Sequence, residues 1–233
     1  ESLEDIINGL YETKYLVEGV SDFVDDIQYF FKDNATNETG YVDSGLRLGV
    51  DTIAPTIAVT PENRALSKLD AVATIKAQDD ASGVNKIMYA ITSSAMYPSS
   101  EVWFTTYGDL ANATMNTAGV WYLHVEAYDN VGNKSYTVKG PYRVDNEGPE
   151  ITINPESLPW INIVPTISMR ATDKMSDFKE LRYMITGNNQ RPDELYDYIT
   201  EEENATIDIL EDGIWYLHVE AEDDLGNISY KLN

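Results

Sequence analysis

The chain has 233 residues with no Cys, and its 40 acidic and 16 basic side chains give a formal net charge of −24. This charge disfavours nucleic acids and anionic membrane surfaces as partners, and no apolar run approaches the ~20 residues of a membrane span. A hydrophobic content of 42% excludes a disordered acidic tail, and the lack of Cys excludes disulfides, thiol nucleophiles and Cys-based zinc sites.

The first part of the chain, residues 1–49, is predicted to be a partial or degenerate module of uncertain fold. Residues 2–11 favour a short helix, because they combine a capping-box pattern with one apolar face. Residues 27–37 follow an Asp-Asn turn pattern, and residues 41–50 lead into Asp51 as a last strand would. We interpret this segment either as the end of a truncated domain or as a shorter module.

The rest of the chain repeats itself with a displacement of 94 residues. The run GVWYLHVEAYDNVGN at 119–133 returns as GIWYLHVEAEDDLGN at 213–227, and the same shift carries Asp51 onto Asp145. One shift without gaps aligns features across the whole unit, which indicates a duplicated domain. The predicted domains are residues 50–143 and 144–233.

Each copy is predicted to consist of short β-strands. Apolar and polar side chains alternate over residues 121–128, which is the period of a strand with one buried face. The same alternation marks strands at 57–59, 73–78, 87–91 and 136–138. Strands separated by Asp, Asn, Gly and Ser turns at intervals of about ten residues indicate an antiparallel sandwich.

These patterns resemble a known class of repeat. The run AxDxxSGV…YAIT over Ala77–Thr92, the GVWYLHVEAYDNVGN run and the VDNEGPEI that follows are similar to the bacterial immunoglobulin-like (Big-type) repeats of surface and secreted proteins. The resemblance covers about residues 50–233. It implies an all-β fold of tandem immunoglobulin-like antiparallel β-sandwiches, preceded here by the short N-terminal module.

Acidic residues recur at three equivalent places in each copy: the linker, the end of the second strand and the late hairpin. They are Asp51, Asp79 and Asp129 in the first copy, and Asp145, Asp173 and Asp223 in the second. An immunoglobulin-like topology places these positions at one pole, where clustered oxygen ligands suit Ca²⁺. We favour the simpler interpretation that each Asp caps its own turn, because no spacing matches a dedicated calcium loop; Ca²⁺ is the candidate ion otherwise.

Aromatic residues that break the repeat are candidates for ligand binding. They are Trp103, Tyr107, Trp160, Tyr196 and Tyr198, and most lie where the two copies diverge. Exposed rings stack on sugars or anchor protein partners, and function tends to lie in variable loops on a constant scaffold. We favour the interpretation that these rings pack in the core or at a sheet edge. The alternative is that they bind a glycan or a host protein.

Nothing in the sequence indicates catalysis. It contains no Gly-x-Ser-x-Gly elbow, Walker loop, His-Glu-x-x-His or Gly-x-Gly-x-x-Gly pattern. His124 and His218 fall at equivalent positions on the polar face of a strand, so we expect both to face solvent and to serve neither a metal nor a dyad. The chain is predicted not to be an enzyme and to bind no organic cofactor.

The combined prediction is a structural spacer or stalk of a bacterial cell-surface or secreted protein. Such a segment would be extracellular and would present a distal domain, with the neighbouring domains of a longer chain as its partners. The alternatives are an adhesin or carbohydrate-binding module, and the accessory domains of a larger secreted hydrolase.

Overall fold

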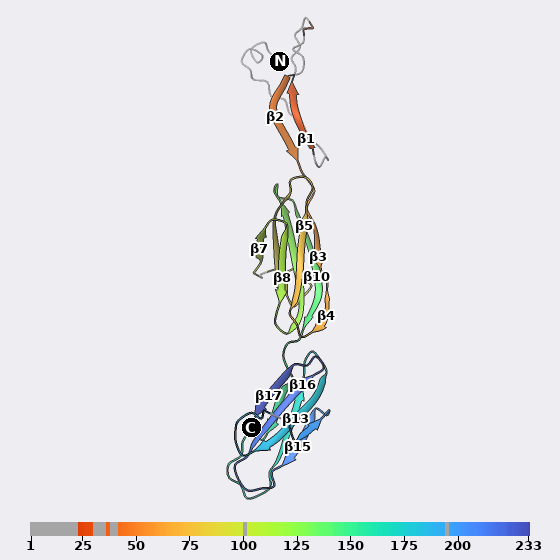
Figure 1. Cartoon of the computed structure of the whole chain (residues 1–233). Coiled ribbons are helices and arrows are strands. Elements are labelled where there is room, and N and C mark those ends of the chain that lie inside the picture. The colour runs from red at the N-terminus through yellow and green to blue at the C-terminus, as the bar shows by residue number, and fades with distance from the viewer. Residues whose placement is uncertain (1–22, 30–35, 38–41, 100–101, 194–195) are drawn as a thin grey trace.

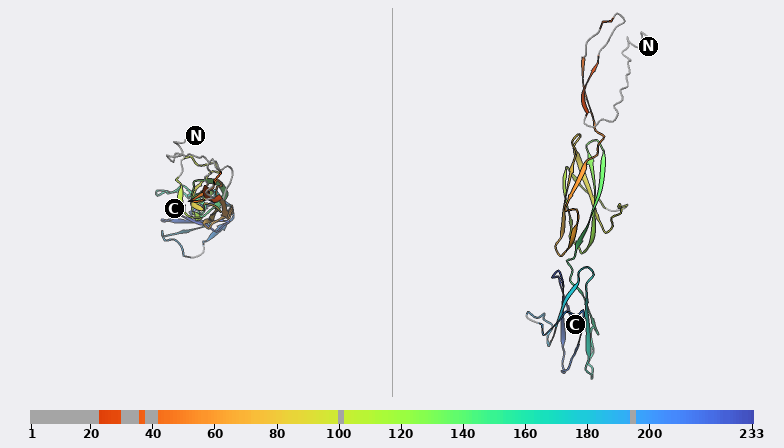
Figure 2. Two further views of the ribbon diagram at one scale, coloured as in Figure 1. Left: turned by 90° about the horizontal axis from the view of Figure 1, so that it is seen from above. Right: turned by 90° about the vertical axis from the view of Figure 1, so that its right-hand side faces the viewer.

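The computed structural model describes residues 23–29, 36–37, 42–99, 102–193 and 196–233, in which all regular secondary structure is β-strand. A two-stranded unit and two sandwiches follow one another along one direction (Figures 1 and 2). In the described part of the chain, no helix is long and apolar enough to cross a membrane. The helix predicted over residues 2–11 lies outside the described residues.

The N-terminal unit is an antiparallel pair. Strands β1 (Phe23–Tyr29) and β2 (Val42–Val50) pair with an irregularity between Asp26 and Gln28. Strand β2 coincides with the strand expected over residues 41–50. The predicted partial module over residues 1–49 stays a prediction, because much of it lies outside the described residues.

The first sandwich places the strands described between residues 56 and 144 in two sheets. They are β3 (Thr56–Thr60), β4 (Arg64–Ser67), β5 (Ala71–Gln78), β6 (Val84–Thr92), β7 (Phe104–Tyr107), β8 (Leu110–Met115), β9 (Gly119–Asp129) and β10 (Lys134–Val144). The sheet orders are β3-β5-β8 and β4-β10-β9-β6-β7, and every pairing is antiparallel except that of β4 with β10. This two-sheet antiparallel arrangement is that of an immunoglobulin-like sandwich.

The period-2 pattern of the sequence builds the core between these sheets. Burial alternates at every position of β5, so that Ala73 and Ile75 face inward and their neighbours face solvent. The opposite sheet contributes Ile87, Leu123 and Val125, all fully buried in the same cluster. Burial of these apolar side chains is the main force that holds the two sheets together.

The second sandwich repeats this plan. Its strands are β11 (Glu150–Asn154), β12 (Thr166–Thr172), β13 (Phe178–Thr186), β14 (Tyr198–Thr200), β15 (Asn204–Asp208), β16 (Tyr216–Asp223) and β17 (Ile228–Leu232). They form sheets of order β11-β12-β15 and β14-β13-β16-β17. The core is equivalent to the first, with Met169, Leu217 and Val219 among its buried residues. The predicted class, tandem immunoglobulin-like sandwiches, is confirmed.

Candidate metal centres

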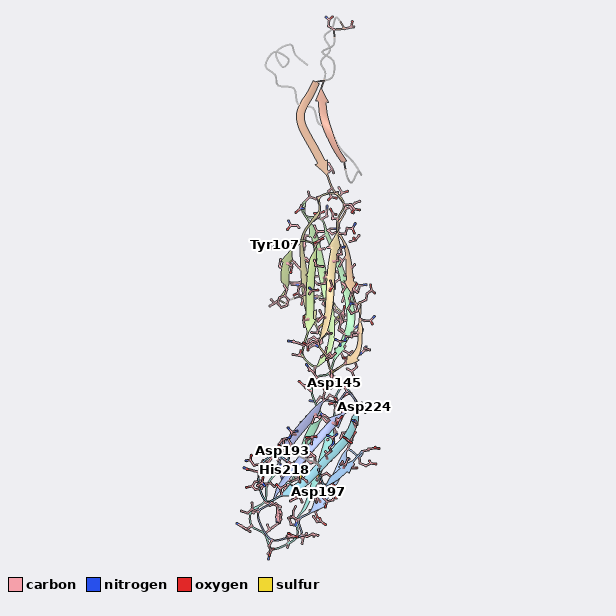
Figure 3. All side chains as sticks on the ribbon, in the orientation of Figure 1. Tyr107, Asp145, Asp193, Asp197, His218 and Asp224 are labelled. Atoms are coloured by element: carbon pink, nitrogen blue, oxygen red, sulfur yellow. The ribbon has the colours of Figure 1, made fainter. Side chains whose placement is uncertain are left out.

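Two clusters of three carboxylates lie where each sandwich meets the segment before it. One contains Asp51, Asp79 and Asp129, and the other contains Asp145, Asp173 and Asp223. In each cluster, one carboxylate oxygen from every member lies within 4.8 Å of the other two. Asp145 lies at the junction between the two sandwiches (Figure 3). The tertiary structure therefore gathers the predicted acidic residues into two groups that can hold a metal ion.

Asp129 is positioned by its own hairpin between β9 and β10. Its Oδ1 accepts backbone N–H bonds from Val131 at 3.0 Å, Gly132 at 2.6 Å and Asn133 at 2.8 Å. Its Oδ2 accepts a bond from the Asn133 side-chain amide at 2.6 Å. Asp129 therefore caps its turn, as the sequence predicts, and these bonds fix the direction of its carboxylate.

The asparagine at the end of each hairpin joins the hairpin to the linker. Asn133 Nδ2 donates to the backbone carbonyl of Asp51 at 3.1 Å, and Asn227 Nδ2 donates to that of Asp145 at 2.8 Å. Because the same amide nitrogens also bond the hairpin aspartate, the linker aspartate is held next to it in both copies. No sequence motif pointed to this function of the asparagines, although both recur at the 94-residue displacement.

Asp223 holds the equivalent position in the second cluster and is fully buried. Its oxygens accept bonds from the backbone of Leu225 and Asn227, from the Asn227 amide and from the Ser176 hydroxyl, at 2.8–2.9 Å. Burial by itself raises the pKa of this carboxyl, but the hydrogen bonds from Asn227 and Ser176 outweigh it and hold the pKa below its ordinary value. Asp223 is therefore ionised at neutral pH.

The third member of each cluster caps the loop that follows the second strand. Asp173 Oδ1 accepts N–H bonds from Met175 at 2.8 Å and Ser176 at 2.9 Å. Asp79 Oδ1 accepts one from Gly83 at 2.7 Å. These loops differ because Gly83, which has a φ of 80°, is replaced by a non-glycine residue in the second copy.

Asp145 differs from the other members, because among the described residues it alone has a buried carboxylate oxygen without a hydrogen-bond partner. The residue is 2% exposed, and its buried Oδ2 has no hydrogen bond. A buried carboxylate oxygen without a donor is costly, and the neighbouring Asp173 and Asp223 carboxylates add repulsion. A cation bound among the three carboxylates would satisfy this oxygen and remove the repulsion.

The donor set fits a hard cation. Carboxylate oxygens are the ligands that Ca²⁺ prefers, and Ca²⁺ accepts irregular geometry with 6–8 oxygens. Zinc sites are instead built mainly from Cys and His side chains, and neither cluster contains one. The residues present therefore fit Ca²⁺ better than a transition metal.

The linker aspartate of the first cluster has more hydrogen-bond donors than that of the second. Asp51 is half-buried, and its oxygens accept backbone N–H bonds from Ile53 and Ser82, each at 3.0 Å. Hydrogen bonding by Ser82, followed by the Ile53 N–H, lowers the pKa of Asp51. Since both oxygens of Asp51 have donors whereas Asp145 Oδ2 has none, the second cluster is the stronger candidate.

The two histidines are buried, so the prediction that they face solvent is wrong. Both rings are fully buried on the outer face of the sheet. His124 contacts the hydroxyls of Thr92 at 2.9 Å and Tyr136 at 2.8 Å, and His218 makes the equivalent contacts. The segment that follows β6 covers this face, where the Tyr97 ring packs on Tyr136 at 5.1 Å. The histidines have hydroxyl and carbonyl partners, which is consistent with a structural role.

The predicted aromatic candidates are divided between the two sandwiches. Trp103 is half-buried and packs on the Tyr97 ring at 5.9 Å, and Tyr107 at the end of β7 is 80% exposed. In the second sandwich, Tyr198 stacks on Tyr183 at 5.0 Å.

The other two candidates also lie in the second sandwich. The Tyr196 hydroxyl donates to Glu220 at 3.2 Å, and Trp160 is 80% exposed in the stretch between β11 and β12. The five residues are divided between two sandwiches, so they do not form one binding surface.

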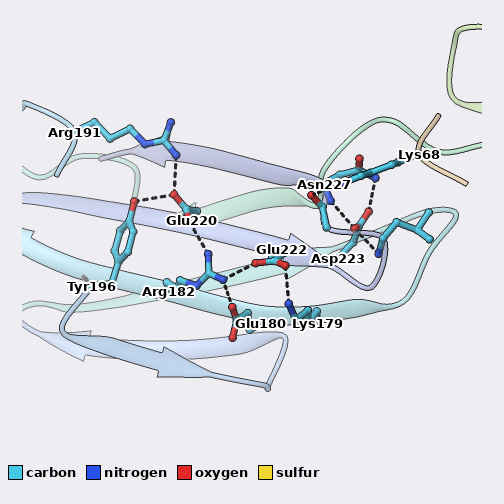
Figure 4. A network of polar contacts seen from close by, with 12 residues as sticks. Lys68, Lys179, Glu180, Arg182, Arg191, Tyr196, Glu220, Glu222, Asp223 and Asn227 are labelled. Carbon is cyan, nitrogen blue, oxygen red and sulfur yellow. Dashed lines mark hydrogen bonds and ion pairs between the residues drawn. The ribbon is translucent and has the colours of Figure 1, made fainter. Parts of the chain in front are cut away.

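An ion-pair network, which was not predicted from the sequence, covers the outer face of the second sandwich. Arg182 on β13 pairs with Glu180 of its own strand and with Glu220 and Glu222 on β16 (Figure 4). Its burial opposes its charge, but the three carboxylates outweigh this and raise the pKa of Arg182. Arg191 pairs with Glu220 at 2.6 Å. The sequence feature that could have indicated this network is the occurrence of opposite charges at alternate positions of two strands.

Comparison with known proteins adds little to this description. No protein family model matches the chain, and no curated protein matches its sequence. Among solved structures, the chain is similar to one described as "Structures of Clostridium thermocellum CbhA fibronectin(III)-like modules". The two are 14% identical with a TM-score of 0.30, over 76% of this chain and 91% of the other. The strand order of the chain itself defines its class, which is that of tandem immunoglobulin-like β-sandwiches.

Proposed function

We propose that this chain is a jointed spacer segment of a bacterial cell-surface or secreted protein, in which Ca²⁺ at each linker holds a sandwich against the segment before it. The observation that carries this proposal is the position of Asp145. A linker residue places a buried, unpartnered carboxylate oxygen beside two carboxylates from loops of the second sandwich. An ion bound there ties the linker to the sandwich.

The linker between the sandwiches is short and closely packed. Strand β10 ends at Val144 and β11 begins at Glu150. A Cβ atom added to Gly148 would lie 2.6 Å from the backbone of Ile228, so the linker runs directly against β17. Such packing fixes the linker against the second sandwich.

Among the described residues, few hydrogen bonds cross the joint. Asn146 Nδ2 in the linker donates to the carbonyl of Asn116 at 2.9 Å, and Lys68 Nζ reaches the carbonyl of Gly226 at 3.5 Å. Interfaces with so few contacts permit relative motion of domains. A calcium ion at the joint therefore has a mechanical effect that these contacts alone do not provide.

The net charge supports an extracellular setting for this function. A formal charge of −24 keeps neighbouring rods apart but also destabilises the compact state by self-repulsion. Calcium-binding modules outside cells have dissociation constants of about 10⁻⁴–10⁻³ M. Bound Ca²⁺ would then offset part of the repulsion at the joints.

A thermal melt tests the calcium site. With a dissociation constant of about 10⁻⁴–10⁻³ M, 10 mM Ca²⁺ stabilises the folded state by about 1.4–2.7 kcal/mol over the EDTA-treated protein. Such a stabilisation raises the melting temperature by several degrees. The Asp145→Asn substitution should abolish the rise for the second sandwich, whereas Asp197→Asn, at an exposed position of the same sandwich, should preserve it.

Two outcomes would contradict the calcium site: no shift up to 10 mM Ca²⁺, or an equal shift with Mg²⁺. Small-angle scattering then tests the spacer function separately. Ca²⁺ should narrow the distribution of angles between the two sandwiches. The maximum dimension of the particle should remain that of two sandwiches arranged end to end. A compact, folded-back particle in Ca²⁺ would contradict a spacer even if the ion binds.

The same rod would serve as an accessory segment beside the catalytic domain of a secreted hydrolase. The domains encoded next to this segment in the full-length gene distinguish the two settings. A catalytic domain would support the accessory role, and further repeats with a sorting signal would support the stalk.

A further inference from the structure

An open hollow lies on the outer face of the second sandwich, beside the ion-pair network. It has a volume of about 770 Å³, and its lining combines two arginines and two acids with Pro192, Tyr196 and Ile199. Sites for small molecules are concavities of roughly 300–1,000 Å³ in which apolar walls surround a few polar groups. The size and the mixed lining of this hollow therefore fit a small ligand.

The polar groups of the hollow hold one another in place. Glu220 is 8% exposed, and it accepts hydrogen bonds from Arg182 Nη1 at 2.7 Å and from Arg191 Nη2 at 2.6 Å. The Tyr196 hydroxyl donates to the same carboxylate at 3.2 Å (Figure 4). A ligand would meet these groups already oriented, so that binding costs little side-chain entropy.

These groups keep hydrogen-bonding capacity for a ligand. A carboxylate accepts about four hydrogen bonds, and among the described residues Glu220 Oε1 accepts only that of Arg182. Arg191 donates to Glu220 through Nη2, and a guanidinium carries further N–H donors on its other nitrogens. Asp193 adds an exposed carboxylate at the rim. Donors and acceptors therefore lie side by side around the hollow.

The walls of the hollow supply apolar contacts. Ile199 on β14 lies opposite Arg182 on β13 and is 58% exposed. Pro192 and the ring of Tyr196 line the same hollow. Both are stiff, because the proline ring is closed and the tyrosine is tied to Glu220 by its hydroxyl. A sugar ring needs both kinds of contact, since it has hydroxyls around its edge and C–H groups on its faces.

The charges of the lining cancel. Arg182 and Arg191 face two acids, Asp193 and Glu220. The neighbouring network adds further carboxylates, and the whole chain has a formal charge of −24. A phosphate or a uronic acid would be repelled by these carboxylates, so the lining favours a neutral ligand.

The residues that a ligand would touch differ between the two sandwiches. The buried glutamate is common to both, as Glu126 and Glu220. In contrast, Tyr97 holds the position of Arg191, and Ser99 holds that of Asp193. Function tends to lie where loops vary on a constant scaffold. The polar lining is therefore a property of the second sandwich, and the first provides the residues for matched variants.

We propose that this hollow binds a neutral saccharide. Hydroxyls of the sugar donate to Asp193 and to Glu220 Oε1 and accept from Arg191, while one face of the ring lies against Ile199 and Pro192. A hydroxyl both donates and accepts, so neighbouring hydroxyls match a carboxylate beside a guanidinium. This site would let a spacer contact a glycan, and it is independent of the calcium sites.

Saturation-transfer-difference NMR on the whole chain tests the site. The neutral probes are cellobiose, lactose and diacetylchitobiose, each at about 10 mM, and methyl glucuronide is the anionic probe. The double variant Asp193→Ser/Ile199→Thr introduces the residues that the first sandwich has at the equivalent positions, and neither residue belongs to the ion pairs of Arg182. At least one neutral probe should bind, and the double variant should weaken its binding about tenfold or more. Asp197→Asn, at an exposed position outside the lining, should leave binding unchanged.

Three results would overturn the proposal. The first is that no neutral probe binds. The second is equal binding by the double variant, which would place the sugar on another surface of the chain. The third is tighter binding of the anionic probe than of any neutral one. The rise in melting temperature with Ca²⁺ should be the same in the double variant as in the unsubstituted chain, so a failure of the saccharide site can be told apart from a failure of the calcium site.

Discussion

The two sandwiches share their inner faces but differ in what covers the outer face of the larger sheet. In the first, the Tyr97 hydroxyl donates to Glu126 at 2.7 Å. In the second, Arg191 holds the position of Tyr97, donates to Glu220 at 2.6 Å, and lies 4.5 Å from the centre of the Tyr230 ring. A buried glutamate is thus retained in both copies, whereas its cover changes from a phenol to a guanidinium.

This difference shows which constraints the fold imposes. The inner face must fill a closed volume, so its side chains remain apolar and similar in size. The outer face needs only a donor for each buried carboxylate, and any donor of suitable reach is acceptable. The first sandwich uses Lys134 and two tyrosines for Glu126, whereas the second builds the ion-pair network around Arg182.

The largest effect is expected where the sandwiches are alike. Leu123→Ala and Leu217→Ala each remove a buried side chain from equivalent core positions and should cost about 2–5 kcal/mol of unfolding free energy. Urea denaturation followed by near-ultraviolet circular dichroism measures both losses. If the two losses of unfolding free energy differ by more than equivalent buried sites normally do, the two cores are not equivalent.

A smaller loss of unfolding free energy is expected when Arg182 of the network is replaced by the residue that the first sandwich has at the equivalent position. Arg182→Met introduces the side chain found at the equivalent Met88 and leaves Glu180, Glu220 and Glu222 without their shared partner. We expect a loss of about 1–3 kcal/mol, reduced by partial solvent exposure. Denaturation at 50 mM and 500 mM NaCl measures it.

The loss from Arg182→Met should shrink at the higher salt concentration, since ions screen the pairs it removes. As the matched control, Met88→Leu in the first sandwich should change stability little and without dependence on salt. A loss in Arg182→Met that is independent of salt would identify packing, and not charge, as the contribution of Arg182.

Acid should destabilise the second sandwich through the same network. Burial raises the pKa of Glu220, but the hydrogen bonds and charges of Arg191 and Arg182 outweigh burial and hold this pKa below the ordinary 4.5. Lys179 holds the pKa of Glu222 below the same value. The unfolded chain then binds more protons, so this stability is present above pH 4.5 and is lost as the pH falls through the folded values. Hydrogen exchange of β16 between pH 6 and pH 3 measures the loss, which should be shallower in Arg182→Met.

The smallest effect is expected for Tyr97→Phe in the first sandwich. This change removes the hydroxyl that donates to Glu126 but keeps the ring packed on Tyr136. Because Tyr128 and Lys134 still donate to Glu126, we expect a loss of about 0.5–1.5 kcal/mol in urea denaturation. A loss as large as that of Leu123→Ala would mean that Tyr97 holds the whole covering segment in place.

Strands β3, β5, β6, β9 and β10 of the first sandwich were predicted, whereas β4, β7 and β8 were not, although burial alternates regularly along β8. The strands around Ile75, Ile87 and Leu123 were all expected, because each combines inward apolar side chains with outward polar ones. The short β7 and β14 at the sheet edges were missed. Their few residues lie largely exposed, as with Tyr107 and Tyr198, so burial imposes no alternation on them.

The candidate metal centres were predicted in their membership but not in their energetics. The displacement of 94 residues and the immunoglobulin-like topology were enough to place Asp145, Asp173 and Asp223 at one pole. The unpartnered Oδ2 of Asp145 and the clasp made by Asn227 were beyond prediction. Both depend on which donors reach the junction after the chain has folded.

The sequence by itself determined the duplication, the strands with one buried face and the residues that cap the hairpins, since all of these follow from local spacing. The tertiary structure decided what covers the second face of each sheet. It buried His124 and Glu126 under a segment some 30 residues away. The physical reason is that a period of two encodes only which side chains share a face. The layer that packs on that face is selected by contacts between distant segments.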